Sequence, residues 1–180
     1  MAYLQEGKLN HNLHFVSEKL LSIIPGPETV EWAEDSQMLF DIAEYPLEEI
    51  RNLFNNLENT KLIKDGRGDW YNYLWEWQKG QSIIRFDFST MFDIEGNETL
   101  WGGSSLYTDC LFSDLIDFWL NLRRFCPRIW LHDWQCNIYS PNAFIREYAL
   151  PILEQSAVDG QHFRSLKLQE EMNVLKSLIL

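Results

Sequence analysis

The chain has 180 residues, 46% of them hydrophobic, which is typical of one globular domain with a sizeable core. Its 15 basic and 27 acidic residues give a formal net charge of -12, which argues against partners rich in phosphate, such as nucleic acids and anionic membranes. The sequence has no signal-peptide pattern and no run of about 18 apolar residues, so we expect a cytoplasmic, soluble protein.

The first third of the chain predicts a helix, two short strands and a second helix. The first helix is expected over residues 12–24, because apolar residues recur there at helical spacing before Pro25-Gly26-Pro27. "TVEWA" (residues 29–33) and "MLFDIA" (residues 38–43) are expected to be strands joined by a polar turn. The second helix is expected to begin near Pro46 and to bury these residues: Leu47, Ile50, Leu53, Phe54 and Leu57.

The stretch "DWYNYLWEW" (residues 69–77) places five aromatic rings in nine residues and predicts a β-hairpin. A turn at Lys79-Gly80 would pair Trp77 with Ser82 and Trp75 with Ile84. Alternation along the strands would then collect these side chains on one apolar face: Tyr71, Tyr73, Trp75, Trp77, Ile84, Phe86 and Phe88. We expect most of these rings to be core. The alternative is a stacking platform for sugars or bases.

The second half of the chain continues with a hairpin or loop at "FDIEGNETLWGGSS" (residues 92–105) and a helix from Ser113, its predicted cap, to about Arg124. Residues 128–140 predict one or two strands. A further helix is expected after the cap Ser140 and Pro141, and a last one near the carboxyl terminus. Strands in the middle and helices at both ends predict a single α+β domain, residues 1–180, with a largely antiparallel central sheet.

No metal or cofactor motif stands out in the sequence. The nearest candidate metal ligands are Cys126, His132, Asp133 and Cys136, but they lack the paired C-x-x-C spacing of structural zinc sites. The three cysteines are an odd number at irregular spacing, which favours reduced thiols over a disulfide framework. We therefore expect no metal, no cofactor and no cysteine nucleophile, and we interpret His11 and His14, which have the spacing of neighbours on a helix, as a surface pair.

The acidic residues are unevenly distributed along the chain. Residues 28–50 contain eight carboxylates and residues 86–122 contain seven, and neither window contains a Lys or Arg. Such windows form either a solvated face that supports solubility or a surface that attracts a basic partner. The contacts to such a partner are predicted at four acids and two aromatic anchors: Asp93, Glu95, Glu98, Asp109, Trp70 and Trp101.

In general character over most of its length, the chain resembles the immunity proteins of bacterial polymorphic toxin and contact-dependent growth inhibition systems. The resemblance rests on a small, acidic, tryptophan-rich chain in which "IWLHDWQCNIYSPNAFIREY" (residues 129–148) passes from strand into a Ser-Pro-capped helix. It implies a non-enzymatic protein that binds one cognate toxin domain, often a basic nuclease, and covers its active site or an adjoining surface. Two alternatives are an adaptor for another protein and a hydrolase of sugar-like substrates that uses a pair of carboxylates from a set such as Asp87, Asp93 and Glu95.

Overall fold

The computed structural model describes eight segments of the chain: residues 3–5, 8–17, 47–65, 72–92, 98–125, 129–133, 137–158 and 165–179. The strands predicted over residues 29–33 and 38–43 lie outside these segments. Within them the elements follow in this order: β1 Tyr3–Gln5, β2 Lys8–Ser17, α1 Leu47–Asn56, β3 Thr60–Asp65, β4 Asn72–Lys79, β5 Ser82–Phe92, β6 Glu98–Cys110, α2 Phe112–Arg123, β7 Ile129–His132, β8 Ile138–Tyr139, α3 Pro141–Ala143, η3 Phe144–Ala149, α4 Leu150–Val158 and α5 Ser165–Leu178.

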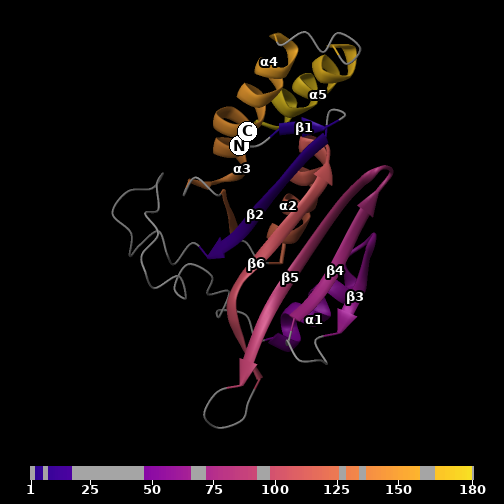
Figure 1. Cartoon of the computed structure of the whole chain (residues 1–180), viewed down its shortest axis with the longest axis vertical. Helices are drawn as coiled ribbons and strands as arrows, with labels where there is room; N and C mark the ends of the chain where they lie inside the picture. Colours follow the sequence, from indigo (N-terminus) through magenta and orange to yellow (C-terminus); the bar gives the residue numbers. More distant parts are fainter. Residues whose placement is uncertain are drawn as a thin grey trace.

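The strands form one antiparallel sheet (Figure 1). From edge to edge they lie in the order β3-β4-β5-β6-β2-β7-β8, and β1 pairs with β2. All of the described pairings are antiparallel. The fold class is therefore α+β with an antiparallel central sheet, as the sequence predicts. Among the described residues, no helix has both the length and the apolar character to cross a membrane.

Helices α1 and α2 cover the same face of the sheet, and the core lies between them and the strands. The ring of Phe54, from α1, lies 4.4 Å from that of Phe86 in β5, measured between centroids. The ring of Phe118, from α2, lies 5.3 Å from Phe86. Helices α3, η3 and α5 pack on α2 at the upper end of the molecule in Figure 1, and α4 packs on α5. There Phe144 of η3 contacts the rings of Phe112 and Trp119.

The chain begins with strands, so the helix predicted over residues 12–24 is wrong where the structure describes it. Residues 12–17 belong to β2, which pairs with β6 on one side and with β7 on the other. Two apolar patterns overlap in this segment. Residues three and four apart suggest a helix, whereas Leu9, Leu13 and Phe15 fit the two-residue alternation of a strand. Because the segment pairs with a strand on each side, it forms a strand. His11 and His14 are consequently not neighbours on a helix.

The β4–β5 hairpin has the predicted faces but a different register. Trp77 pairs with Ile84 and Lys79 with Ser82, so the turn consists of Gly80 and Gln81. Gly80 has a φ of 58°, a conformation that glycine adopts without strain. The predicted pairing differs from the observed one by two residues, and a two-residue shift leaves every side chain on its face.

The aromatic core prediction is confirmed for the described rings. On the inner face of the hairpin these side chains are at most 4% exposed: Tyr73, Trp75, Trp77, Ile84 and Phe86. Tyr71 and Trp70 lie outside the described residues. The indole Nε1 of Trp75 donates to Asn55 Oδ1 at 3.1 Å, which satisfies its polar atom from α1.

Two helix starts illustrate local and distant capping. Ser140 caps the helix that begins at Pro141, as predicted, by accepting a hydrogen bond from the Ala143 N–H. The N-cap of α2, in contrast, is Leu111 rather than the predicted Ser113. The Ser113 N–H and hydroxyl donate to the carboxylate of Glu171, at 2.6 and 2.8 Å. A carboxylate from α5 therefore accepts hydrogen bonds at the amino-terminal end of α2 and joins the two helices.

Candidate binding groove between α1 and α2

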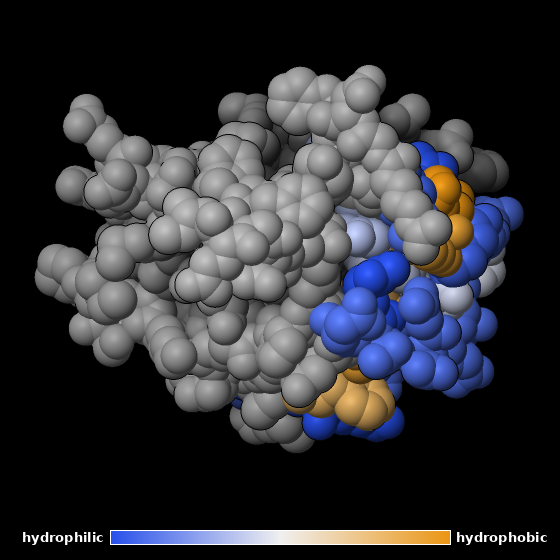
Figure 2. Space-filling model, turned by 90° about the horizontal axis from the view of Figure 1, so that it is seen from below, coloured by the Kyte–Doolittle hydropathy of each residue, from blue (hydrophilic) through white to orange (hydrophobic). Residues whose placement is uncertain are grey.

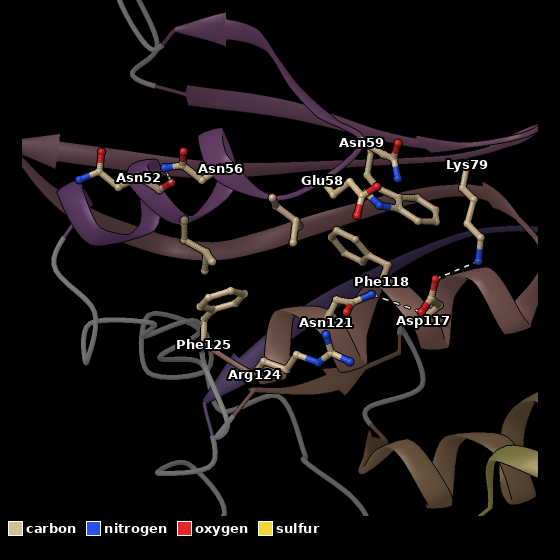
Figure 3. A pocket seen from close by; sticks show the side chains of 13 residues that line it. Asn52, Asn56, Glu58, Asn59, Lys79, Asp117, Phe118, Asn121, Arg124 and Phe125 are labelled. Atoms are coloured by element: carbon tan, nitrogen blue, oxygen red, sulfur yellow. Dashed lines mark hydrogen bonds and ion pairs between the residues drawn. The ribbon is translucent and has the colours of Figure 1, made fainter.

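A groove of about 900 Å³ separates α1 from the carboxyl-terminal half of α2 on the helix-covered side of the sheet (Figure 3). The turn after α1 and the end of β4 complete its walls. Its volume lies within the range of about 300–1,000 Å³ that is typical of ligand sites. The lining residues are Asn52, Leu53, Asn56, Leu57, Glu58, Asn59, Trp77, Lys79, Asp117, Phe118, Asn121, Arg124 and Phe125.

The base of the groove is apolar and continuous with the core. Trp77 and Phe118 pack with their ring centroids 5.5 Å apart and are 4% and 0% exposed, so they support the groove without offering much surface to a ligand. Leu53 and Leu57 of the α1 side are only partly buried. Phe125, just after α2, is 62% exposed. The apolar surface that a ligand can reach therefore comes mainly from these last three side chains.

Two hydrogen-bonded turns, one after α1 and one after α2, hold the walls of the groove in place. After α1, the Thr60 N–H donates to the Leu57 carbonyl at 3.2 Å, and Asn59 adopts a φ of 63°, which asparagine tolerates better than most residues. After α2, the Arg124 N–H donates to the Asn121 carbonyl and the Phe125 N–H to the Leu122 carbonyl, at 3.2 and 3.1 Å. These bonds place Asn59 on one wall and Phe125 on the other.

A charged cluster closes one end of the groove. Lys79 Nζ lies 3.1 Å from Asp114 Oδ1 and 2.9 Å from Asp117 Oδ2. The hydrogen bond to Asp117, and then the bond to Asp114, raises the pKa of Lys79 above its ordinary 10.5. Asp117 also accepts from Asn121 Nδ2 at 3.2 Å, and Asp114 accepts from the Ser82 hydroxyl at 2.5 Å. These ion pairs join α2 to the end of β4, and the two carboxylates more than balance the single charge of Lys79.

The rest of the groove is rich in carboxamides. Asn52 and Asn56 lie one turn apart on α1, Asn59 follows in the turn, and Asn121 belongs to α2 (Figure 3). Asn56 Nδ2 donates to the Asn52 carbonyl at 2.7 Å. Among the described residues, the side chains of Asn52, Asn59, Glu58 and Arg124 make no hydrogen bond or ion pair that would occupy them. The groove therefore offers several neutral donors and acceptors with one carboxylate and one guanidinium.

The predicted contact residues fall into three groups. Asp93, Glu95 and Trp70 lie outside the described residues. Glu98 and Trp101 belong to the first part of β6, where the structure describes only the backbone.

Asp109 is exposed near the opposite end of that strand, eleven residues from Glu98. Eleven residues of strand span about 35 Å, so Asp109 is far from the start of β6. Of the four predicted acids, the structure therefore places only the backbone of Glu98 and the whole of Asp109, and these two lie near opposite ends of β6.

The candidate metal ligands are also only partly described. Cys126 and Cys136 lie outside the described residues, and no group of three potential ligands occurs within them. Asp133 is 1% exposed, and its two oxygens accept from the Asn137 N–H and the Tyr139 hydroxyl, at 3.0 and 2.9 Å. Burial raises the pKa of Tyr139, which keeps its hydroxyl protonated as a donor. Asp133, the residue after β7, is thus linked to the start of β8.

The groove was not predicted from the sequence, although part of its signal is there. Asn52 and Asn56 have the spacing of neighbours on the second predicted helix, beside Leu53 and Leu57. What the sequence does not reveal is that α2 lies opposite them. Fold and groove together define an α+β protein with a candidate binding site. Comparisons with protein-family models, with curated proteins and with solved structures find no match.

Proposed function

We propose that the protein is a non-enzymatic, cytoplasmic inhibitor that binds and neutralises a cognate toxin domain, a basic nuclease being the partner best matched to its charge. The observation that carries the non-enzymatic part is the bonding of the buried carboxylates. Each of the three described carboxylates that are buried, Glu76, Asp133 and Glu171, is engaged by groups that hold the fold together. A catalytic acid or base would instead face a cavity.

Glu76 illustrates this on the sheet face opposite to the helices. Its oxygens lie 2.7 Å from Lys61 Nζ and 2.8 Å from Arg85 Nε, across the two neighbouring strands. Hydrogen bonds from Lys61 and then from Arg85 lower the pKa of Glu76 below its ordinary 4.5, against the opposing effect of burial. A carboxylate in this setting stays ionised and serves as a structural anion.

The charge of the chain supports an acidic inhibitor of a basic partner. Nucleases carry basic surfaces because they bind phosphates, and a net charge of -12 would accelerate encounter with such a surface. The two acidic windows concentrate that charge. The same charge disfavours nucleic acid itself as a partner of this chain.

The hydrolase alternative has less support in the groove. A hydrolase of sugar-like substrates needs two carboxylates that flank the scissile bond, about 5–10 Å apart. Glu58 and Asp117 line the groove, but Asp117 is bonded to Lys79 and Asn121. Binding through the groove therefore agrees better with the structure than acid–base chemistry does.

The test is protection of cells from the product of the neighbouring gene. Cells that express that gene alone and cells that co-express this protein are compared for survival, and the purified pair is titrated by calorimetry. We expect survival only with co-expression, and a 1:1 complex with a Kd in the nanomolar range, about -12 kcal/mol. Binding without protection would indicate an adaptor, and the absence of both would overturn the proposal.

The position of the interface is tested separately with serine substitutions. Replacing Asp93, Glu95, Glu98 and Asp109 together removes four negative charges from the predicted contact region. We expect a lower association rate and an affinity reduced by more than about threefold at low salt. The matched control removes four exposed acids elsewhere: Glu48, Glu147, Glu154 and Glu170. An equal loss in both variants would mean that net charge, and not this placement, governs binding.

A further inference from the structure

The groove between α1 and α2 has the chemistry of a site for a peptide main chain. Four carboxamides line it, from Asn52, Asn56, Asn59 and Asn121. A carboxamide carries one acceptor and a donor group, as a peptide unit does, and so can bond to either side of an extended backbone. Asn121 and Asn56 each donate within the protein, through Nδ2, and keep their Oδ1 atoms for a ligand.

The charges of the groove argue against other ligand classes. A phosphorylated ligand requires several available cations, and Lys79 is already neutralised by Asp114 and Asp117, which leaves Arg124. A carbohydrate requires an open aromatic platform, but Trp77 and Phe118 are at most 4% exposed. A neutral groove with carboxamide walls and a partly open aliphatic base suits a peptide better than either.

The exposed aromatic ring at the rim supports the same conclusion. Phe125 is 62% exposed and lies across the hollow from the α1 side chains (Figure 3). Seen from below, the described surface is mostly hydrophilic and is interrupted by small hydrophobic patches (Figure 2). A large apolar side chain exposed beside a groove, within a polar surround, is a feature of protein-contact sites.

We propose that this groove binds an extended segment of the partner protein, with a bulky apolar side chain held between Phe125 and two leucines, Leu53 of α1 and Leu57 just after it. Glu58 and Arg124 lie on opposite sides of the hollow, so the segment would carry a basic residue toward Glu58 and an acidic one toward Arg124 (Figure 3). This inference rests on the proposed function in one respect, which is that the segment belongs to the toxin domain.

A phage-displayed library of short linear peptides, selected against the whole chain, tests the inference directly. Enriched peptides are synthesised and titrated by calorimetry against the native protein and two double variants. The groove variant carries Asn52→Ala with Phe125→Ser. The control carries Asn173→Ala with Val174→Ser, which changes the same kinds of exposed side chain on α5.

We expect the enriched peptides to share one large apolar residue and to bind the groove variant at least about tenfold more weakly, because it loses a hydrogen bond and an apolar contact. The control variant should bind as the native protein does. An Arg124→Glu variant should select peptides in which the acidic residue is replaced by a basic one. Failure to enrich any peptide, or equal affinity for the groove variant and the native protein, would overturn the inference.

The cell-protection assay separates this inference from the proposed function. If the groove variant loses both peptide binding and protection, and the control keeps both, the groove is where the toxin segment binds. If the groove variant loses peptide binding but still protects cells with full toxin affinity, the proposed function stands and the assignment of the segment to the toxin is wrong. If peptides bind and no toxin is neutralised, the groove stands without the proposed function.

Discussion

The two faces of the β4–β5 hairpin are built from alternate residues of the same strands and have opposite chemistry. The inner face is aromatic and aliphatic, with Trp75 and Phe86 stacked at 6.0 Å beneath α1 and α2. The outer face carries a charged row across four strands, in which the neighbours are Lys61, Glu76, Arg85 and Tyr107. None of the described helices packs over this row, and its members other than Glu76 are exposed.

The contrast shows how one strand pair can stabilise the fold with its inner face and present a polar surface to water with its outer face. The apolar surface that the inner face buries stabilises the folded state by about 25 cal/mol per Å². The ion pairs of the outer face are half in water and contribute about 0–1 kcal/mol each. Mutations on the two faces should therefore differ in size and in their dependence on pH.

The largest effect is expected from Trp75→Ala. Trp75 is 1% exposed, contacts the rings of Phe54, Tyr73 and Phe86, and donates to Asn55, so the substitution leaves a cavity and an unused acceptor. We expect the free energy of unfolding to fall by about 3–5 kcal/mol, measured by urea denaturation. The control is Gln78→Ala on the outer face, which should change it by less than about 0.5 kcal/mol. Similar losses in both would contradict the division of the faces.

An intermediate effect is expected from Glu76→Gln. The variant keeps the shape but loses the charge between Lys61 and Arg85, and we expect a loss of about 1–2 kcal/mol at pH 7. Because the folded-state pKa of Glu76 is lowered, its contribution is present above the unfolded pKa and is lost as the pH falls through the folded one.

The pH dependence makes this prediction specific to the charge. The stability difference between the native protein and Glu76→Gln should shrink as the pH falls below about 4.5, because Glu76 is then protonated first in the unfolded state and, at lower pH, in the folded state as well. Urea denaturation at pH 7 and at a series of acidic values measures this difference. A constant difference over that range would show that shape, rather than charge, holds Glu76 in place.

The sequence predicts the inner face well because its signal is local. Alternating apolar residues from Tyr73 to Phe86 identify the hairpin and its buried side, and a two-residue error in register leaves that result unchanged. The same local reasoning fails for β2, where helical and strand spacings coexist. There the pairing with β6 and β7 determines that the segment is a strand. It also misses β3, whose residues are largely exposed and polar.

The groove and the cap on α2 could not be predicted because each joins distant parts of the chain. Ser113 looks like a helix cap, but its partner is Glu171, 58 residues away. The walls of the groove come from residues 52–59 and 117–125, and nothing in either stretch identifies the other. Such sites depend on how elements pack, which is information that spacing along the chain does not contain.

The smallest effects are expected from the two cations of the outer row. Lys61 and Arg85 have side chains that are 60% and 53% exposed, so Lys61→Ala and Arg85→Ala should each lower the free energy of unfolding by only about 0.2–1 kcal/mol. Glu76 retains one cation in each single variant. The double variant leaves a nearly buried carboxylate without either, so its loss should exceed the sum of the single losses by about 0.5 kcal/mol or more.

A double-mutant cycle in urea, at pH 7 and at pH 3, measures this coupling. The excess should be smaller at pH 3, because Glu76 without its two cations takes up a proton more readily and a neutral carboxyl group needs no cation. Additive losses at pH 7 would mean that Glu76 is hydrated well enough to need no cation. The outer row would then support solubility but not the free energy of unfolding. The two faces would differ only in how much apolar surface they bury.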